Sequence, residues 1–189
     1  MLSETTDVIV ADDNQMLLSV MSEIFKECGY TVRTATDGFS ALEQIRKQVP
    51  HVLLSDLNMP GMSGFELLSV VRRKFPEIKT IAMSTDYPGE DVVPGIPADA
   101  YYAKGTSNVA RLFEIVRAID TGRDVLEPRA ETPIWVQGLP IHGWGSSIVF
   151  VACPECLRTF PHFLSRAIPF QGEERCPHCF EPVQLAIVR

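Results

Sequence analysis

The chain has 189 residues, of which 46% are hydrophobic, and a formal net charge of −7 at pH 7. This length accommodates one medium domain and one small domain. The acidic balance argues against nucleic acid as a partner, and no apolar run approaches the roughly 18 residues that span a bilayer. The acidic stretch Met1 to Asp7 does not resemble a secretory signal, so we expect a cytoplasmic protein with no membrane partner.

Short apolar runs alternate with helical periodicity over the first 120 residues. We expect strands over 8–11, 30–35, 51–55, 80–84 and 100–103, and helices around 17–28, 39–45, 65–75 and 109–119. Between the fourth and fifth strands, segment 86–97 holds Pro88, Pro94 and Pro97, and each proline costs a helix interior about 3 kcal/mol. The pattern predicts a parallel sheet covered by helices on both faces, with a degraded fourth helix that is at most one turn long.

Reactive side chains stand where four of these strands end. Asp12 and Asp13, Asp56, Ser84 and Lys104 follow different strands, and the carboxyl ends of parallel strands share one edge of the sheet. Neighbouring carboxylates suit Mg²⁺, and a lysine beside them neutralises the oxygens of a transferring phosphoryl group. Asp56 is the expected nucleophile because it ends the central strand. Each of these acids, taken alone, would ordinarily be interpreted as a solvated carboxylate with no further role.

These residues lie in motifs that resemble the receiver domain of two-component response regulators, over about residues 6–121. The motifs are Ala11-Asp12-Asp13-Asn14, Leu54 to Gly64, Met83-Ser84 and Asp99 to Lys104. The resemblance implies a doubly wound, flavodoxin-like sheet. It also implies that the chain is a phosphoacceptor signalling protein rather than an enzyme, and that it receives its phosphoryl group from a histidine kinase or a phosphotransfer protein.

The resemblance also assigns roles to individual residues. Asp56 would be the phosphoacceptor, with Ser84 as the switch hydroxyl and Lys104 as the phosphate-binding cation. Mg²⁺ would be held by Asp13, Asp56 and the backbone carbonyl of Asn58, with Asp12 acting through water. Tyr101 matches the aromatic residue that swings inward when Ser84 engages phosphate.

Three departures from this family pattern affect the switch. Thr85 occupies a position usually held by a smaller residue, and Gly105 replaces the commoner proline after Lys104. The proline-rich segment 86–97 replaces the usual fourth helix, so we expect the signal to leave through this loop and not through a helical dimer face.

Cys28, on the apolar side of its helix, is expected to pack in the core, and His51 is expected to have no catalytic role.

The end of the chain contains two CxxC motifs. Cys153 and Cys156 are separated by nineteen residues from Cys176 and Cys179, near the spacing of structural four-cysteine zinc sites. We predict a linker over 122–133 and a small β-rich domain over 134–189, with strands at 134–136, 148–152 and 183–187. The motifs resemble a zinc ribbon, although Leu157 and Phe180 stand where glycine is common.

Several alternatives remain at this point. The four cysteines suit Zn²⁺ best, with a rubredoxin-like iron site or a redox dithiol as other possibilities, and the histidines 142, 162 and 178 are expected to be surface or packing residues. We expect residues 1–121 to form a response regulator receiver and the module to bind an unknown protein target. The alternatives are a transcription regulator whose ribbon contacts DNA or polymerase, and a phosphatase of related fold. The phosphatase ranks last, because Asn58 stands where its second acid would be.

Overall fold

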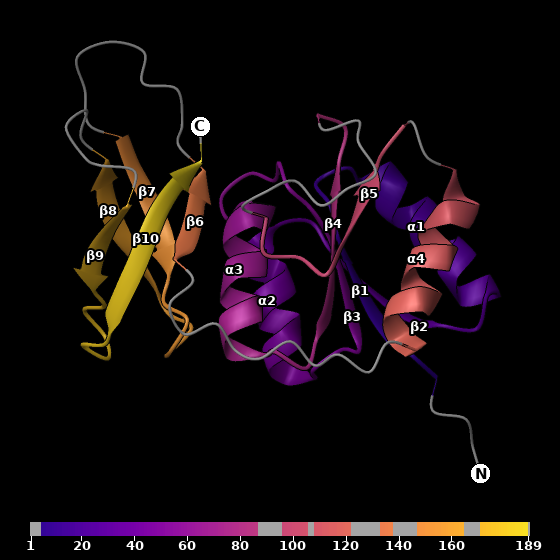
Figure 1. Cartoon of the computed structure of the whole chain (residues 1–189), viewed down its shortest axis with the longest axis horizontal. Helices are drawn as coiled ribbons and strands as arrows, with labels where there is room; N and C mark the ends of the chain where they lie inside the picture. The colour runs from indigo at the N-terminus through magenta and orange to yellow at the C-terminus, as the bar shows by residue number, and fades with distance from the viewer. Residues whose placement is uncertain are drawn as a thin grey trace.

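The computed structural model describes residues 5–86, 96–105, 108–121, 133–137, 147–164 and 171–188. Figure 1 shows a central sheet between two layers of helices, with a group of strands from the C-terminal part of the chain lying beside helix α3. In this described part of the chain, no helix combines the length and the apolarity that crossing a membrane requires.

The central sheet contains the five strands expected from the sequence. They are β1 (Asp7–Ala11), β2 (Thr31–Ala35), β3 (Val52–Asp56), β4 (Lys79–Ser84) and β5 (Ala100–Ala103). All neighbouring pairs are parallel, and the order is β2-β1-β3-β4-β5, so β3 is central. Every residue of β1 and β3 is buried, which explains their continuous apolar runs.

Two helices cover each face of this sheet (Figure 1). Helices α1 (Gln15–Glu27) and α4 (Val109–Thr121) pack on one face, and α2 (Gly38–Lys47) and α3 (Gly64–Lys74) pack on the other. The first three helices begin at side chains that accept hydrogen bonds from their first turns: Asn14, Asp37 and Ser63. Most of the segment expected to replace the fourth helix, residues 87–95, lies outside the described residues.

Cys28 is exposed, so the expectation that it packs in the core is wrong. Helix α1 ends at Glu27, and Cys28 is the C-cap, from which Gly29 turns the chain at a φ of +88°. The apolar face of α1 is made by Leu18, Met21 and Phe25. The apolar periodicity of the sequence continues to Cys28, one residue beyond the end of the helix, and for this reason the sequence suggested that Cys28 is buried.

The C-terminal strands form two small sheets, which with their turns we call the cysteine module. Strand β10 (Pro182–Val188) pairs parallel with β6 (Ile134–Gln137) and antiparallel with β9 (Gln171–Arg175), while β7 (Ser147–Ala152) and β8 (Thr159–Leu164) form an antiparallel pair. The three strands expected here are confirmed. Strands β8 and β9 were not expected, because Pro161 interrupts the first and the second, Gln171–Arg175, is polar. The expected linker, apart from Pro133, lies outside the described residues.

Candidate functional site

The predicted reactive residues meet at one edge of the central sheet. Asp12 follows β1, Asp56 ends β3, and Lys104 follows β5. The Nζ of Lys104 lies 2.6 Å from Oδ2 of Asp12 and 2.8 Å from Oδ1 of Asp56. Both carboxylates are buried, at 1% and 6% exposure, so the ammonium group compensates two charges that have lost most of their water.

This crowding shifts the protonation equilibria of the site. Burial raises the pKa of the Asp56 carboxyl, and the hydrogen bond and charge of Lys104 oppose this shift without cancelling it. Burial acts to lower the pKa of Lys104, but the two carboxylates outweigh it and raise this pKa. Among the described residues, one lysine is paired with these two buried acids, which leaves the carboxylates short of positive charge.

A divalent cation fits this deficit. Carboxylate oxygens of Asp12, Asp13 and Asp56 all lie within 4.8 Å of one another, and Asp13 is exposed while the other two are buried. Hard oxygen ligands with an open, wet side are the set that Mg²⁺ prefers. The side-chain amide of Asn58 donates to Asp86 at 2.6 Å, and the role of its backbone carbonyl as a further ligand stays a prediction.

Ser84 and Tyr101 are connected through the end of β4. The Ser84 hydroxyl oxygen accepts a hydrogen bond from the backbone N–H of Asp86 at 3.1 Å. The Tyr101 hydroxyl donates to the Ser84 carbonyl at 3.3 Å, and the tyrosine is buried at 3% exposure. Tyr101 therefore already lies inward in this structure. If the Ser84 hydroxyl moved towards a phosphoryl group, it would exchange its contact with the Asp86 N–H for a contact with a phosphoryl oxygen.

The loop after Asp56 is held by a glycine at the start of α3. The backbone N–H of Gly64 donates to the Leu57 carbonyl at 3.0 Å, and a Cβ on Gly64 would overlap the carbonyl oxygen of Asp56. Only a residue without a side chain allows this approach. Helix α3 therefore begins in direct contact with the backbone of the candidate nucleophile.

The four paired cysteines come together in the cysteine module. Their sulfur atoms all lie within 4.8 Å of one another, and the pairs Cys153–Cys179 and Cys156–Cys176 are each 3.7 Å apart. A tetrahedral ion with Zn–S bonds of about 2.3 Å requires sulfur separations of about 3.8 Å. The arrangement fits a tetrahedral metal, and these separations are too long for disulfide bonds.

The two CxxC turns have the same backbone hydrogen bonds. Leu157 donates to the Cys153 carbonyl and Phe180 to the Cys176 carbonyl, each at 2.9 Å. Leu157 and Phe180 take the left-handed conformation, with φ of 57° and 64°. This conformation explains why glycine is common at these positions. Here a leucine and a phenylalanine adopt it, each at a conformational cost of about 1 kcal/mol or more.

Hydrogen bonds and burial make the four thiols unequal. Burial raises the pKa of Cys153 to about 12. Burial also acts upward on Cys176, but N–H groups of His178 and Cys179 and the neighbouring thiols lower its pKa to about 7. A bound cation would favour the thiolate form at every position, because it is the thiolate that binds metal.

The histidines of the described module do not join the sulfur cluster. His178 contacts the Thr159 carbonyl through Nε2 at 3.1 Å, and His162 lies 3.3 Å from Glu174. His51 accepts the Asp7 backbone N–H through Nδ1 at 2.9 Å, which is a structural contact. His142 lies outside the described residues.

The sequence patterns missed Glu66, which lies at 2% exposure between α3 and the cysteine module. Its Oε1 accepts the Ala152 backbone N–H at 2.6 Å, and burial raises its pKa to about 8 with that N–H opposing the shift. In the sequence, Glu66 looks like an ordinary acid in the first turn of a helix, where acids are common. Its tertiary partner leaves no local signal.

Comparison with known proteins agrees with the geometry of the sheet edge. The family profile described as the response regulator receiver domain matches residues 8–104. The nitrogen assimilation regulatory protein NtrX of Azorhizobium caulinodans is 31% identical over 121 residues, which cover 62% of this chain and 27% of NtrX. The probable transcriptional regulatory protein TcrX of Mycobacterium tuberculosis is 32% identical over 129 residues, or 63% of this chain and 55% of TcrX. The chain therefore spans only part of the length of these relatives.

Solved structures show the same similarity. A CheY-like receiver domain protein from Methanospirillum hungatei superposes with a TM-score of 0.55 at 25% identity, covering 61% of this chain and 93% of that protein. The response regulator TrrA from Thermotoga maritima, in complex with Mg²⁺ and BeF, gives a TM-score of 0.56 at 28% identity, covering 61% of this chain and 99% of TrrA.

Proposed function

Since this chain belongs to the response regulator receiver family, we propose that it is a phosphorylation-controlled signalling protein that accepts a phosphoryl group on Asp56. The observation that carries the proposal is the contact of Lys104 with both Asp12 and Asp56 at the carboxyl edge of the sheet. A merely solvated acid at a strand end would not be buried and paired in this way.

The residues at this edge divide the chemistry among them. A carboxylate oxygen of Asp56 forms the new bond to phosphorus, and the P–N bond to the donor histidine breaks, with the imidazole leaving and recovering its proton from solvent. Lys104 turns its ammonium group from the carboxylates towards the phosphoryl oxygens, and the Ser84 hydroxyl donates to one of them. Asp12, Asp13 and Asp56 would hold Mg²⁺, which supplies charge neutralisation at the phosphoryl oxygens.

Phosphorylation is tested with acetyl phosphate and Mg²⁺ on the full chain, followed by intact-mass spectrometry. We expect one added phosphoryl group on the natural protein and none on Asp56→Asn. Asp13 provides the matched control, because it is a neighbouring carboxylate at the same edge, and Asp13→Asn should retain Asp56 as the acceptor at a lower rate. Equal labelling of the natural protein and Asp56→Asn would refute the assignment.

For the cysteine module, we propose a structural zinc site and a protein-binding role. The sulfur separations of 3.7 Å support a tetrahedral metal, and we assign the module to a small domain after a linker at 122–133. Residues 123–189 carry 6 Lys and Arg against 7 Asp and Glu, which does not favour the DNA backbone.

A second candidate is a transcription regulator whose module contacts DNA or polymerase. This candidate is favoured by relatives that are described as transcriptional regulators, such as TcrX. The match to TcrX covers 63% of this chain. An electrophoretic assay over a range of salt concentrations separates the two. Binding that weakens steeply with salt would support the DNA role, and no binding at low salt would support the protein-binding role.

A further inference from the structure

Helix α3 is buried on every side. Each residue from Gly64 to Arg72 is buried, whereas a helix on the face of a sheet ordinarily keeps a polar, exposed stripe. Figure 1 shows the reason, because the strands of the cysteine module lie along the side of α3 that faces away from the sheet. The hydrophobic core on this face is continuous from the sheet through α3 into the module.

Two polar side chains of α3 bind the backbone of the module. Glu66 accepts the N–H of Ala152 at 2.6 Å, and Ser69 accepts the N–H of Trp135 at 3.2 Å. The spacing of three residues places both acceptors on one face of the helix. Ala152 directly precedes Cys153, so Glu66 holds the strand that leads into the first CxxC turn.

An ion pair extends this contact towards the end of the helix. Arg73 lies 3.2 Å from Oε1 of Glu155, and Lys74 lies 3.6 Å from Oε2. Glu155 is the second inner residue of the first CxxC turn. The same turn that supplies two sulfur ligands is therefore held by α3 both before and within the motif.

The other end of α3 meets the candidate nucleophile. Gly64 leaves no room for a side chain against the Asp56 carbonyl oxygen, so a displacement of the Asp56 loop is passed directly to the first turn of α3. Glu66 lies in that first turn. The chain of contacts from Asp56 to Ala152 thus runs through Gly64 and Glu66.

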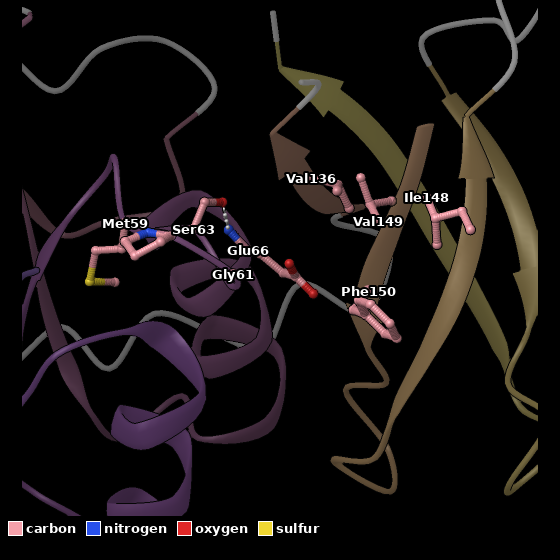
Figure 2. A pocket seen from close by; sticks show the side chains of 9 residues that line it. Met59, Gly61, Ser63, Glu66, Val136, Ile148, Val149 and Phe150 are labelled. Atoms are coloured by element: carbon pink, nitrogen blue, oxygen red, sulfur yellow. Dashed lines mark hydrogen bonds between the residues drawn. The ribbon is translucent and has the colours of Figure 1, made fainter. Parts of the chain in front are cut away.

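Space for such a displacement exists at the joint. A cavity of about 220 Å³ separates the loop at Met59, Pro60 and Gly61 from strand β7 of the module, with Glu66 beside it. Figure 2 shows the Glu66 carboxylate directed towards the module, near Phe150. Protein interiors are usually close-packed, so a gap at this position leaves the loop room to move.

We propose that α3, with residues 57–63 before it, is the surface through which the phosphorylation state of Asp56 controls the cysteine module, and that phosphorylation loosens the hold of α3 on this module. This route differs from the exit through segment 86–97 that the sequence led us to expect, and residues 87–95 of that segment lie outside the described residues. This inference rests on the proposed function of Asp56. Every buried side-chain nitrogen and oxygen of the described residues has a hydrogen-bond partner, and for Glu66 and Ser69 that partner includes the backbone of the cysteine module. A shift of the first turn of α3 away from the module lengthens the Glu66 contact and leaves a buried carboxyl group unpaired.

The test uses hydrogen exchange of the full chain, followed by NMR at single amides. The amides of Ala152 and Trp135 report the contact directly, because their hydrogens are bound by side chains of α3. Beryllofluoride with Mg²⁺ serves as the phosphoryl analogue. The Lys104 amide, which donates to the Ser84 carbonyl at 2.8 Å, reports whether the analogue is bound.

With the analogue bound, we expect both reporter amides to exchange faster, by about tenfold or more. Unchanged or slower exchange, together with a shifted Lys104 signal, would overturn the inference and leave the proposed function standing. If the Lys104 signal does not shift, the proposed phosphoryl site itself is refuted, and the inference falls with it.

Coupling between two sites is reciprocal, which supplies a second measurement. Glu155→Gln removes the ion pairs with Arg73 and Lys74. It should tighten beryllofluoride binding by about threefold, because fewer contacts between α3 and the module must be broken when the analogue binds. Glu181→Gln is the matched control, since Glu181 is an exposed acid just after the other CxxC turn. Equal affinities of the two variants would contradict the coupling.

Discussion

Lys104 illustrates how much one residue contributes to the sheet edge. Its ammonium group contacts two carboxylates that come from different strands, and its own exposure is only 14%. Without it, Asp12 and Asp56 would lose the ion-pair partner that the described residues give them. Glu66 is the opposite case, a buried acid whose partner is a neutral backbone N–H.

Lys104→Met is expected to lower the rate of phosphorylation by acetyl phosphate by about 100-fold, because the transferring oxygens lose their cationic partner. The matched control is Lys47→Met, whose exposed lysine pairs with Glu43 on α2. Mass spectrometry over a time course measures both rates. A Lys104→Met rate within about twofold of the control would show that the lysine has no role in the transfer.

The ionisation of Glu66 should appear in the pH dependence of stability. Its pKa is raised from 4.5 to about 8, so between these pH values the folded protein holds a proton that the unfolded chain has released. The free energy of unfolding should therefore fall as pH rises through this window, by about 1.4 kcal/mol per unit, and this contribution should level off above pH 8.

Urea unfolding at a series of pH values measures this effect, with Glu66→Gln as the reference because glutamine keeps the acceptor for the Ala152 N–H and cannot ionise. The difference in slope between the two proteins isolates Glu66 from the other titrating groups. Parallel curves for the two proteins would mean that Glu66 ionises normally in the folded state.

Among the elements, α3 combines two functions that usually belong to different helices. Its start contacts the backbone of Asp56 at the end of β3, and its outward face packs against the cysteine module. Gly64 is the residue that makes the first contact possible. The glycine lowers the helix propensity of the first turn, and the fold accepts this loss to obtain the close approach.

Gly64→Ala should destabilise the protein by about 2 kcal/mol or more, even though alanine favours a helix by about 1 kcal/mol over glycine. The reason is the overlap of the added methyl group with the Asp56 carbonyl oxygen. Gly172→Ala on β9 is the matched control, because nothing lies within 4 Å of the position where its methyl group would be built. Thermal unfolding of both variants is the measurement, and similar midpoints would contradict the predicted overlap.

In the whole molecule, the carboxylate site and the four-cysteine cluster are built on one continuous hydrophobic core. The start of α3 touches the backbone of Asp56, and the same helix packs against strands β6 and β7 of the cysteine module. The buried apolar residues of the described part of the cysteine module, such as Val151, Phe160 and Leu185, belong to the same hydrophobic cluster as those of α3. A small β-rich region of this kind depends on a metal or on a neighbouring domain for its stability.

Purified protein should contain about one zinc ion per chain, and its removal by a chelator should unfold the cysteine module while the central sheet persists. Elemental analysis measures the first expectation, and NMR of the Ala152 and Lys104 amides measures the second. Cys156→Ser should lose the metal, whereas Cys28→Ser, at an exposed cysteine outside the cluster, should retain it. Metal retained by Cys156→Ser would refute the four-sulfur site, and iron in place of zinc would refute the choice of metal.

The five strands of the central sheet, the edge at which its reactive residues gather and the grouping of four cysteines in two CxxC turns could all be predicted from local patterns. Asp12, Asp56, Ser84 and Lys104 could be placed together because parallel strands end at a common edge, so a local pattern was enough to predict a distant contact. The CxxC spacing likewise carries its geometry within each short turn. The predicted strands of the cysteine module followed from their apolar alternation.

The position of the cysteine module against α3, and the burial of α3 that results, could not be predicted from such patterns. The contact of Glu66 with Ala152 joins residues 86 positions apart, and it involves a backbone N–H that every residue except proline possesses. No periodicity or motif marks such a contact. Local patterns record the face that an element buries in its own domain, and they do not record a second surface that packs against it from elsewhere in the chain.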